Sequence, residues 1–293
     1  MKSVLLLIAV VCSVSGLPAL YDDERIIGGD LAKPGNFSYV VSITENDRHF
    51  CGGFIYSNRW IVTAASCVVG KTASKLKVIA GQVSAITSDP NEQTLAVYTI
   101  TPVPQYDSTL KTYDIALLRL STDIVFDYKY VDFVSYNELD DDLPGIVMGW
   151  GTTFDGGLES VNLHFGEVSV IPMTQDTTCG KYKYPEFNFA TMICVSNNAT
   201  ATATSTPASG EVEVHDDSLP GSPCQYDEGS PLVQVNEEGV PIAVGILSKI
   251  NGCSADSYSV YTRVSIFYSW LTNTAGQQPT RPTPTTTTEA ISG

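Results

Sequence analysis

Residues 49–67 read HFCGGFIYSNRWIVTAASC, and this stretch indicates the fold most directly. Within it, Trp60–Ala64 is a short apolar run of strand length, and turn signals separate it from its neighbours. Runs of the same kind recur at Tyr39–Thr44, Ile115–Leu120, Gly145–Met148, Val168–Ile171 and Ile242–Leu247. Only Ser265–Thr272 suggests a helix. The sequence therefore predicts an all-β barrel or sandwich with one helix near its C-terminal end.

The first residues indicate secretion. Residues 1–16 begin with Lys2, continue with an apolar run over Val4–Val14 and end in small residues, as a secretory signal peptide does. The run is too short to span a bilayer, and no other apolar stretch is long enough. We therefore expect a soluble, secreted, extracellular protein without a membrane span. Residues 17–25 follow as a short polar propeptide ending in Arg25.

The mature chain keeps an even number of cysteines, because Cys12 leaves with the signal peptide. The remaining six are Cys51, Cys67, Cys179, Cys194, Cys224 and Cys253. In an oxidising compartment this number favours three disulfides, although it leaves their pairing open. A metal site is the alternative, but there is no C-x-x-C pair and the three histidines are widely spaced. We expect no metal and no other cofactor.

The charge of the chain limits its partners. Lys and Arg number 16 against 32 Asp and Glu, which gives a formal net charge of −16. Nucleic acids and anionic membranes attract basic patches, so neither is an expected partner. The charge favours solubility outside the cell, and it could steer a basic protein partner toward the surface.

Residues 26–275 are expected to form the globular body. Inside it, residues 195–223 are rich in Ala, Thr, Ser and Pro followed by acids, a composition that predicts a mobile loop. Residues 276–293 are rich in Thr and Pro, which is typical of an O-glycosylated stalk or of a disordered tail without sugar. Sequons predict N-glycosylation at Asn36 and Asn198.

Several segments resemble those of one enzyme family. Arg25–Gly29 is similar to the activation site of trypsin-like zymogens, where cleavage after a basic residue frees an Ile or Val terminus. His49–Gly53 and Trp60–Ala65 resemble the H-F-C-G-G and W-V-L-T-A-A segments of the first barrel. Further matches follow in family order at Tyr113–Leu118, Gly149–Gly151, Cys224–Pro231 and Val260–Val264. Over roughly residues 26–273 the chain resembles the trypsin/chymotrypsin-like serine proteases.

The resemblance implies an architecture and a cysteine pairing. The family has two six-stranded antiparallel β-barrels and a C-terminal helix. Carried over to this chain, its disulfides become Cys51–Cys67, Cys179–Cys194 and Cys224–Cys253.

The resemblance also implies that catalysis is lost. In the family a Ser attacks, a His takes its proton, and a buried Asp orients the His. Ser66 stands at the His position, where a hydroxyl cannot act as a base near neutral pH. Glu228 stands at the Ser position, because Cys224–Pro231 has the family's length of eight residues. Asp114 matches the family's Asp, and His49 matches a structural His beside the first disulfide.

The specificity pocket of the family is changed as well. Following Ser248, Lys249 replaces Trp and Ile250 replaces an open Gly, while Ser259 replaces the Gly before V-Y-T. Small residues keep this pocket open in the family, so we expect Ile250 and Ser259 to fill it. Ser222 stands near the pocket base, where trypsins carry Asp. A working pocket of altered preference is the alternative.

One further change concerns the oxyanion hole. Tyr226 replaces the Gly whose N–H lines that hole. Its N–H survives, but a tyrosine side chain disfavours the required turn.

The conformational switch of the family is retained. Arg25 and Ile26 form a cleavable site, and Asp227 matches the Asp that pairs with the freed ammonium of Ile26. This combination suggests a binding role gated by cleavage, and inheritance of old scaffold residues is the alternative.

We therefore predict a secreted, non-catalytic serine protease homologue that acts by binding an extracellular protein. It would be a regulator, decoy or inhibitor of a protease or of another secreted hydrolase. Two alternatives stay open: a residual or altered serine endopeptidase, and a structural component of an extracellular matrix or coat.

Overall fold

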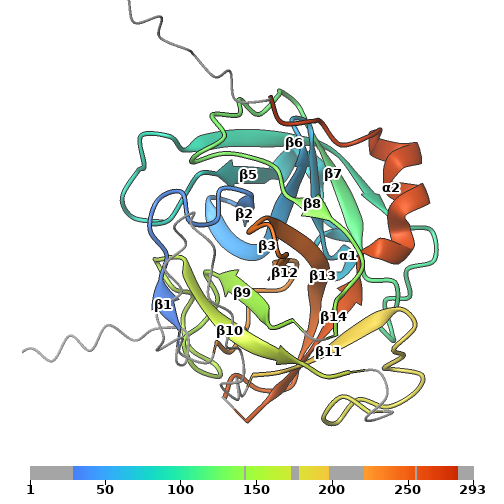
Figure 1. Cartoon of the computed structure of the whole chain (residues 1–293). Coiled ribbons are helices and arrows are strands. Elements are labelled where there is room, and N and C mark those ends of the chain that lie inside the picture. The colour runs from blue at the N-terminus through green and yellow to red at the C-terminus, as the bar shows by residue number, and fades with distance from the viewer. Residues whose placement is uncertain (1–28, 142, 173–177, 198–220, 255, 283–293) are drawn as a thin grey trace, which may run out of the picture.

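The first of two β-barrels is formed by the N-terminal half of the chain (Figure 1). The computed structural model describes residues 29–141, 143–172, 178–197, 221–254 and 256–282. Six antiparallel strands close this barrel in the order β2-β3-β4-β7-β6-β5. They are β2 (Val40–Glu45), β3 (Arg48–Ser57), β4 (Trp60–Thr63), β5 (Leu76–Ala80), β6 (Gln93–Pro102) and β7 (Ala116–Leu120). The fully buried side chains of Ile43, Phe54 and Leu117 lie in its core.

The second barrel is formed by the C-terminal half. Its strands are β9 (Gly145–Gly149), β10 (His164–Val170), β11 (Met192–Ser196), β12 (Pro231–Val235), β13 (Pro241–Ile250) and β14 (Tyr258–Arg263). They run β9-β10-β11-β14-β13-β12, and β12 pairs with β9 to close the sheet. Two short strands join it: β1 (Asp30–Leu31) pairs with β10, and β8 (Ser135–Tyr136) lies parallel to β13. The double antiparallel barrel expected from the sequence is confirmed.

Helix is confined to short segments. The C-terminal helix α2 covers Tyr268–Ala275 and follows the 3₁₀ turn η2 at Ser265–Phe267, close to the expected position. A second helix, α1 (Ala65–Val68), and the 3₁₀ turn η1 (Ala73–Lys75) were not expected. A helix of four residues is too short to show a helical repeat in sequence. No helix among the described residues is long and apolar enough to cross a bilayer.

The ends of the low-complexity insert belong to the second barrel. Strand β11 continues to Ser196, Asn197 is fully buried, and Ser222 is buried where the chain re-enters the described part. Residues 195–197 and 221–223 of the expected mobile loop therefore belong to the folded body, and residues 198–220 lie outside the described residues. Asn198 lies outside the described residues, whereas Asn36 is exposed.

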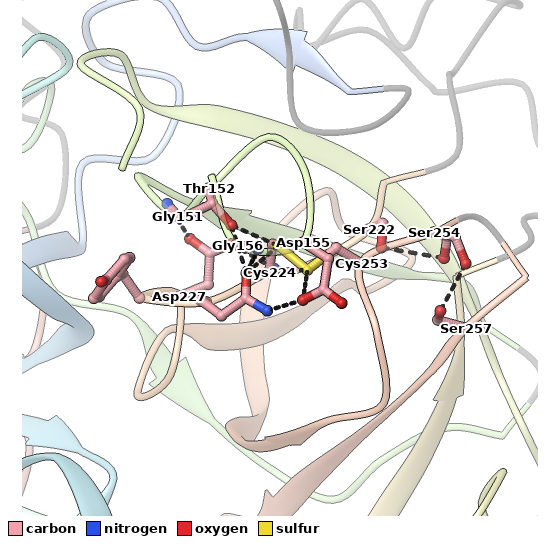
Figure 2. Close-up of a disulfide and its surroundings, with 12 residues drawn as sticks. Gly151, Thr152, Asp155, Gly156, Ser222, Cys224, Asp227, Cys253, Ser254 and Ser257 are labelled. Atoms are coloured by element: carbon pink, nitrogen blue, oxygen red, sulfur yellow. Dashed lines mark hydrogen bonds between the residues drawn. A yellow bond between two sulfur atoms is a disulfide. The ribbon is translucent and has the colours of Figure 1, made fainter. Parts of the chain in front are cut away.

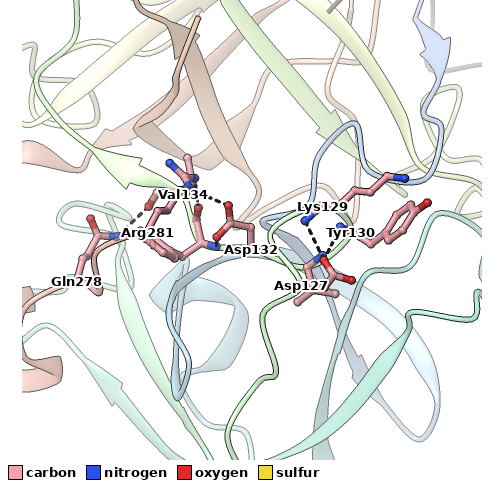
Figure 3. A network of polar contacts seen from close by, with 9 residues as sticks. Asp127, Lys129, Tyr130, Asp132, Val134, Gln278 and Arg281 are labelled. Carbon is pink, nitrogen blue, oxygen red and sulfur yellow. Dashed lines mark hydrogen bonds and ion pairs between the residues drawn. The ribbon is translucent and has the colours of Figure 1, made fainter. Parts of the chain in front are cut away.

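The start of the C-terminal tail is held on the first barrel (Figure 3). The Tyr56 hydroxyl donates to the Gly276 carbonyl at 2.6 Å, and the Gln278 amide donates to the Val134 carbonyl at 2.8 Å. Arg281 Nε donates to the buried carboxylate of Asp132 at 2.8 Å. Residues 276–282 therefore pack against the body.

Candidate functional site

Both barrels contribute to the cleft at the triad-equivalent positions. Asp114 is fully buried just before β7, and it accepts hydrogen bonds from the Ser66 N–H at 2.7 Å and the Ser66 hydroxyl at 2.8 Å. Ser248, on β13 of the other barrel, donates its hydroxyl at 2.6 Å. Burial raises the pKa of Asp114, and these bonds oppose that rise. The hydroxyls of Ser66 and Ser248 thus donate to the Asp114 carboxylate, which in the family orients an imidazole.

His49 lies beside this cleft in a structural role. Its Nδ1 lies 2.8 Å from the Ser42 hydroxyl, and its Nε2 lies 3.0 Å from the carbonyl oxygen of Tyr226. Burial lowers the pKa of His49 to about 4, so the ring is neutral near pH 7. The imidazole therefore supports the loop at Tyr226, and it does not hydrogen-bond to Asp114.

Glu228 binds the backbone of its own loop. Tyr226 has a φ of 76°, so it adopts the left-handed conformation that a glycine adopts without strain. Its N–H donates to Glu228 Oε2 at 2.9 Å. The turn therefore forms with a tyrosine in a conformation that its side chain disfavours.

The environment of Glu228 resembles that of a bound anion. Burial raises the pKa of this half-buried carboxyl. The N–H groups of Glu228 itself and of Tyr226, and the charge of Lys111, act in the opposite direction by favouring the ionised form. In the family these two N–H positions stabilise the oxyanion of the reacting carbonyl. Here they face the chain's own carboxylate.

Lys111 brings a cation into the same space. Its ammonium lies 3.4 Å from the carbonyl oxygen of Ser248, and it favours the ionised forms of Asp114 and Glu228. Sequence reasoning missed this residue. Its position three residues before Asp114 was the one sequence signal that it lies near the triad-equivalent residues. Its contact with Ser248 joins the two barrels, so the spacing of residues in the sequence cannot predict it.

Buried hydrogen bonds close the base of the specificity pocket. The Asn197 amide donates to the Ser222 hydroxyl at 2.7 Å, and the Ser259 hydroxyl donates to the Asn197 carbonyl oxygen at 3.4 Å. Ser222 also donates to the Ser254 carbonyl at 3.3 Å (Figure 2). All three side chains at positions 197, 222 and 259 are buried. Asn197 was missed because it was assigned to the low-complexity insert.

Lys249 and Ile250 line a cavity of about 470 Å³, to which Lys111 and Glu228 also contribute. The Lys249 ammonium donates to the Glu186 carbonyl and lies 5.4 Å from the centre of the Tyr182 ring. The Tyr182 hydroxyl donates to the carbonyl of Ile250 at 2.9 Å. Ile250 thus forms part of the wall of this cavity, which Ser222 and Ser259 do not line, and the expectation that Ile250 and Ser259 fill the specificity pocket stays a prediction.

Asp227 is buried near the third disulfide, beside Gly151 and Cys224 (Figure 2). Its carboxylate accepts the Gly151 N–H at 2.7 Å and the Cys224 N–H at 2.9 Å. Burial raises its pKa to about 7. Arg25 and Ile26 lie outside the described residues, so the pairing of Asp227 with a freed N-terminus stays a prediction.

Three disulfides join Cys51 to Cys67, Cys179 to Cys194 and Cys224 to Cys253, the pairs that the resemblance implies. The third one ties the loop of Glu228 to the segment after β13 (Figure 2).

Within the described ranges, no group of three or more His, Cys, Asp or Glu side chains is arranged to hold a metal ion.

Comparisons with known proteins agree with this architecture. The family model described as Trypsin matches residues 26–271. Trypsin alpha of Drosophila melanogaster is 31% identical, with 94% of this chain and 98% of the relative covered. Trypsin-1 of Astacus astacus is 31% identical, with coverage of 84% and 98% respectively. Coagulation factor IX of Oryctolagus cuniculus is 30% identical, with coverage of 85% and 84%.

Proposed function

The chain belongs to the trypsin family, and on that premise we propose that it is a non-catalytic member that acts by binding another extracellular protein. The observation that carries the proposal is the hydrogen bond from the Tyr226 N–H to the Glu228 carboxylate. A carboxylate at this place competes with a substrate carbonyl for the donors that would stabilise an oxyanion. The same substitution leaves no nucleophilic hydroxyl at position 228.

The acid–base chemistry supports the same proposal. A serine nucleophile becomes reactive when an adjacent base takes its proton. The hydroxyl at position 66 is not such a base, and Asp114 is already engaged by Ser66 and Ser248. Lys111, the cation at this place, does not accept a proton in its charged form.

The binding role rests on what the chain retains. It keeps both barrels, three disulfides and an open cavity lined in part by Glu228. A protein with this surface and no turnover can hold a protease ligand without consuming it, as a regulator, decoy or inhibitor would. The signal peptide predicted over residues 1–16 would place this activity outside the cell.

A hydrolysis assay tests the proposal. Purified protein, cleaved after Arg25 and freed of the cleaving protease, is incubated with a mixed peptide library beside an active trypsin, and products are identified by mass spectrometry. We expect no product above the level of a protein-free control. Cleavage that persists after repurification and follows the concentration of the protein would overturn the proposal in favour of an altered endopeptidase.

A further inference from the structure

The cavity of about 470 Å³ collects lysines from three separate segments. Lys111 comes from the loop before β7, Lys181 from the loop before β11, and Lys249 from β13. The whole chain has only 16 Lys and Arg against 32 acids. Three of these few basic side chains therefore line a cavity that also contains Glu228, one of the triad-equivalent residues.

These lysines are not neutralised by ion pairs. The five ion pairs among the described residues lie elsewhere, and none includes Lys111, Lys181 or Lys249. By contrast, Lys77 on β5 pairs with Asp47 at 2.6 Å. Carboxylates of Asp155, Glu186 and Glu228 line the same cavity, but none of them forms a direct ion pair with these lysines. A ligand carboxylate could make the direct contacts that the wall carboxylates do not make.

Two of the ammonium groups approach one aromatic ring. Lys181 Nζ lies 5.3 Å and Lys249 Nζ 5.4 Å from the centre of the Tyr182 ring. The Lys249 side chain is nearly buried, with a residue exposure of 5%. Burial lowers the pKa of Lys249, the charge of Lys111 acts in the same direction, and Glu186 and Asp114 oppose it. An anion in the cavity would stabilise all three charged lysines.

The acids along the walls limit how much negative charge the ligand can carry. Glu228 is held by the Tyr226 N–H, Asp155 accepts a bond from the Gln225 amide, and Glu186 is exposed. These carboxylates would repel a densely charged polyanion such as a sulfated glycan. A single carboxylate on an otherwise uncharged segment meets the lysines with much less of that repulsion.

We propose that the cavity binds a peptide carboxylate, held by Lys111, Lys181 and Lys249. The inference rests on the proposed binding function and specifies the chemistry of the partner: an acidic side chain or a C-terminal carboxylate. Either source presents the same group, and the two are separated by experiment.

The probe is a set of heptapeptide amides whose only charge is one Glu, placed at a different position in each peptide. Each peptide is matched by the same peptide with Gln in place of Glu. Binding to the intact protein is measured by fluorescence polarisation with an uncharged dye. We expect the best Glu peptide to bind at least about tenfold more tightly than its Gln match. A parallel set of Gln peptides ending in a free acid or an amide tests the C-terminal source.

Substitutions of single lysines test which of them bind the peptide carboxylate. Lys181→Met and Lys249→Met should each reduce the preference for the carboxylate, whereas Lys77→Met should leave it unchanged. Lys181 is exposed, so its variant keeps the test valid if the buried Lys249→Met variant fails to fold. Melting temperatures of all variants are compared before binding is measured.

Three results would overturn the inference. They are equal binding of acidic and uncharged peptides, a preference that survives in a folded Lys181→Met variant, and stronger competition by a sulfated oligosaccharide than by a Glu peptide. Turnover of a bound peptide would instead overturn the proposed lack of catalysis, so the two failures are distinguishable.

Discussion

The uncleaved protein should lose stability as the pH rises, because Asp227 is buried without a cation. In the described structure, its carboxylate is satisfied only by the N–H groups of Gly151 and Cys224. Burial raises its pKa from 3.8 to about 7. The neighbouring His49, whose pKa is lowered to about 4, carries no compensating charge near neutral pH.

The sign and size of the effect follow from linkage between folding and protonation. Below the unfolded pKa both states are protonated, and Asp227 contributes no pH dependence. Between 3.8 and about 7 the folded state holds the proton more tightly, so the free energy of unfolding falls as the pH rises. Each pKa unit corresponds to about 1.4 kcal/mol, which gives a loss of about 4 kcal/mol in total.

Urea unfolding from pH 4 to pH 8 measures this loss, with Asp227→Asn as the control that removes the titration. We expect the stability of the unaltered protein to fall, relative to the control, by about 4 kcal/mol. Cleavage after Arg25 should abolish most of this difference if the ammonium of Ile26 pairs with Asp227. Parallel stability curves for the two uncleaved proteins would refute the reasoning, and an unchanged slope after cleavage would refute the pairing.

Three further perturbations test the cleft and the tail. The double substitution Ser66→His with Glu228→Ser should leave kcat/KM at least about a hundredfold below that of trypsin on any peptide, because it does not restore the placement of the substrate. A kcat/KM equal to that of trypsin would show that the cleft still places a substrate correctly. Glu228→Ala should lower the free energy of unfolding by about 1–3 kcal/mol and Glu228→Gln by less, since only the alanine variant removes the acceptor of the Tyr226 N–H. Equal stability of the two variants and the unaltered protein in urea would contradict this hydrogen bond. Arg281→Ala should lower the free energy of unfolding by about 1–2 kcal/mol, because it leaves the buried carboxylate of Asp132 without its cation. The control Arg59→Ala breaks a surface ion pair and should cost at most about 1 kcal/mol. A larger loss for Arg59→Ala than for Arg281→Ala in thermal melts would contradict the contact between the tail and the first barrel.

The architecture was predictable because it depends on local signals that keep their order. Short apolar runs, cysteines and segments such as His49–Gly53 are read directly from the chain. The residues at the triad-equivalent positions were predictable by the same means. Helix α1 was not, because four residues are too few for a helical repeat.

Contacts between distant segments could not be predicted in this way. The composition of residues 276–293 suggested a free tail, yet Gln278 and Arg281 bond to the Val134 carbonyl and to Asp132, more than a hundred residues earlier. The sequence predicted that Glu228 stands at the serine position, but the bond of its carboxylate to the Tyr226 N–H depends on a left-handed tyrosine. Residue propensity argues against that conformation, and tertiary packing holds it in place.

Labelling with a fluorophosphonate tests the central claim most directly, because this reagent reacts with an activated serine. The protein is cleaved after Arg25, repurified and treated beside active trypsin, and intact mass and peptide maps are recorded. We expect no covalent adduct on the protein under conditions that label trypsin fully. A stoichiometric adduct on any serine, including Ser66 or Ser230, would contradict the claim that this chain has lost catalysis.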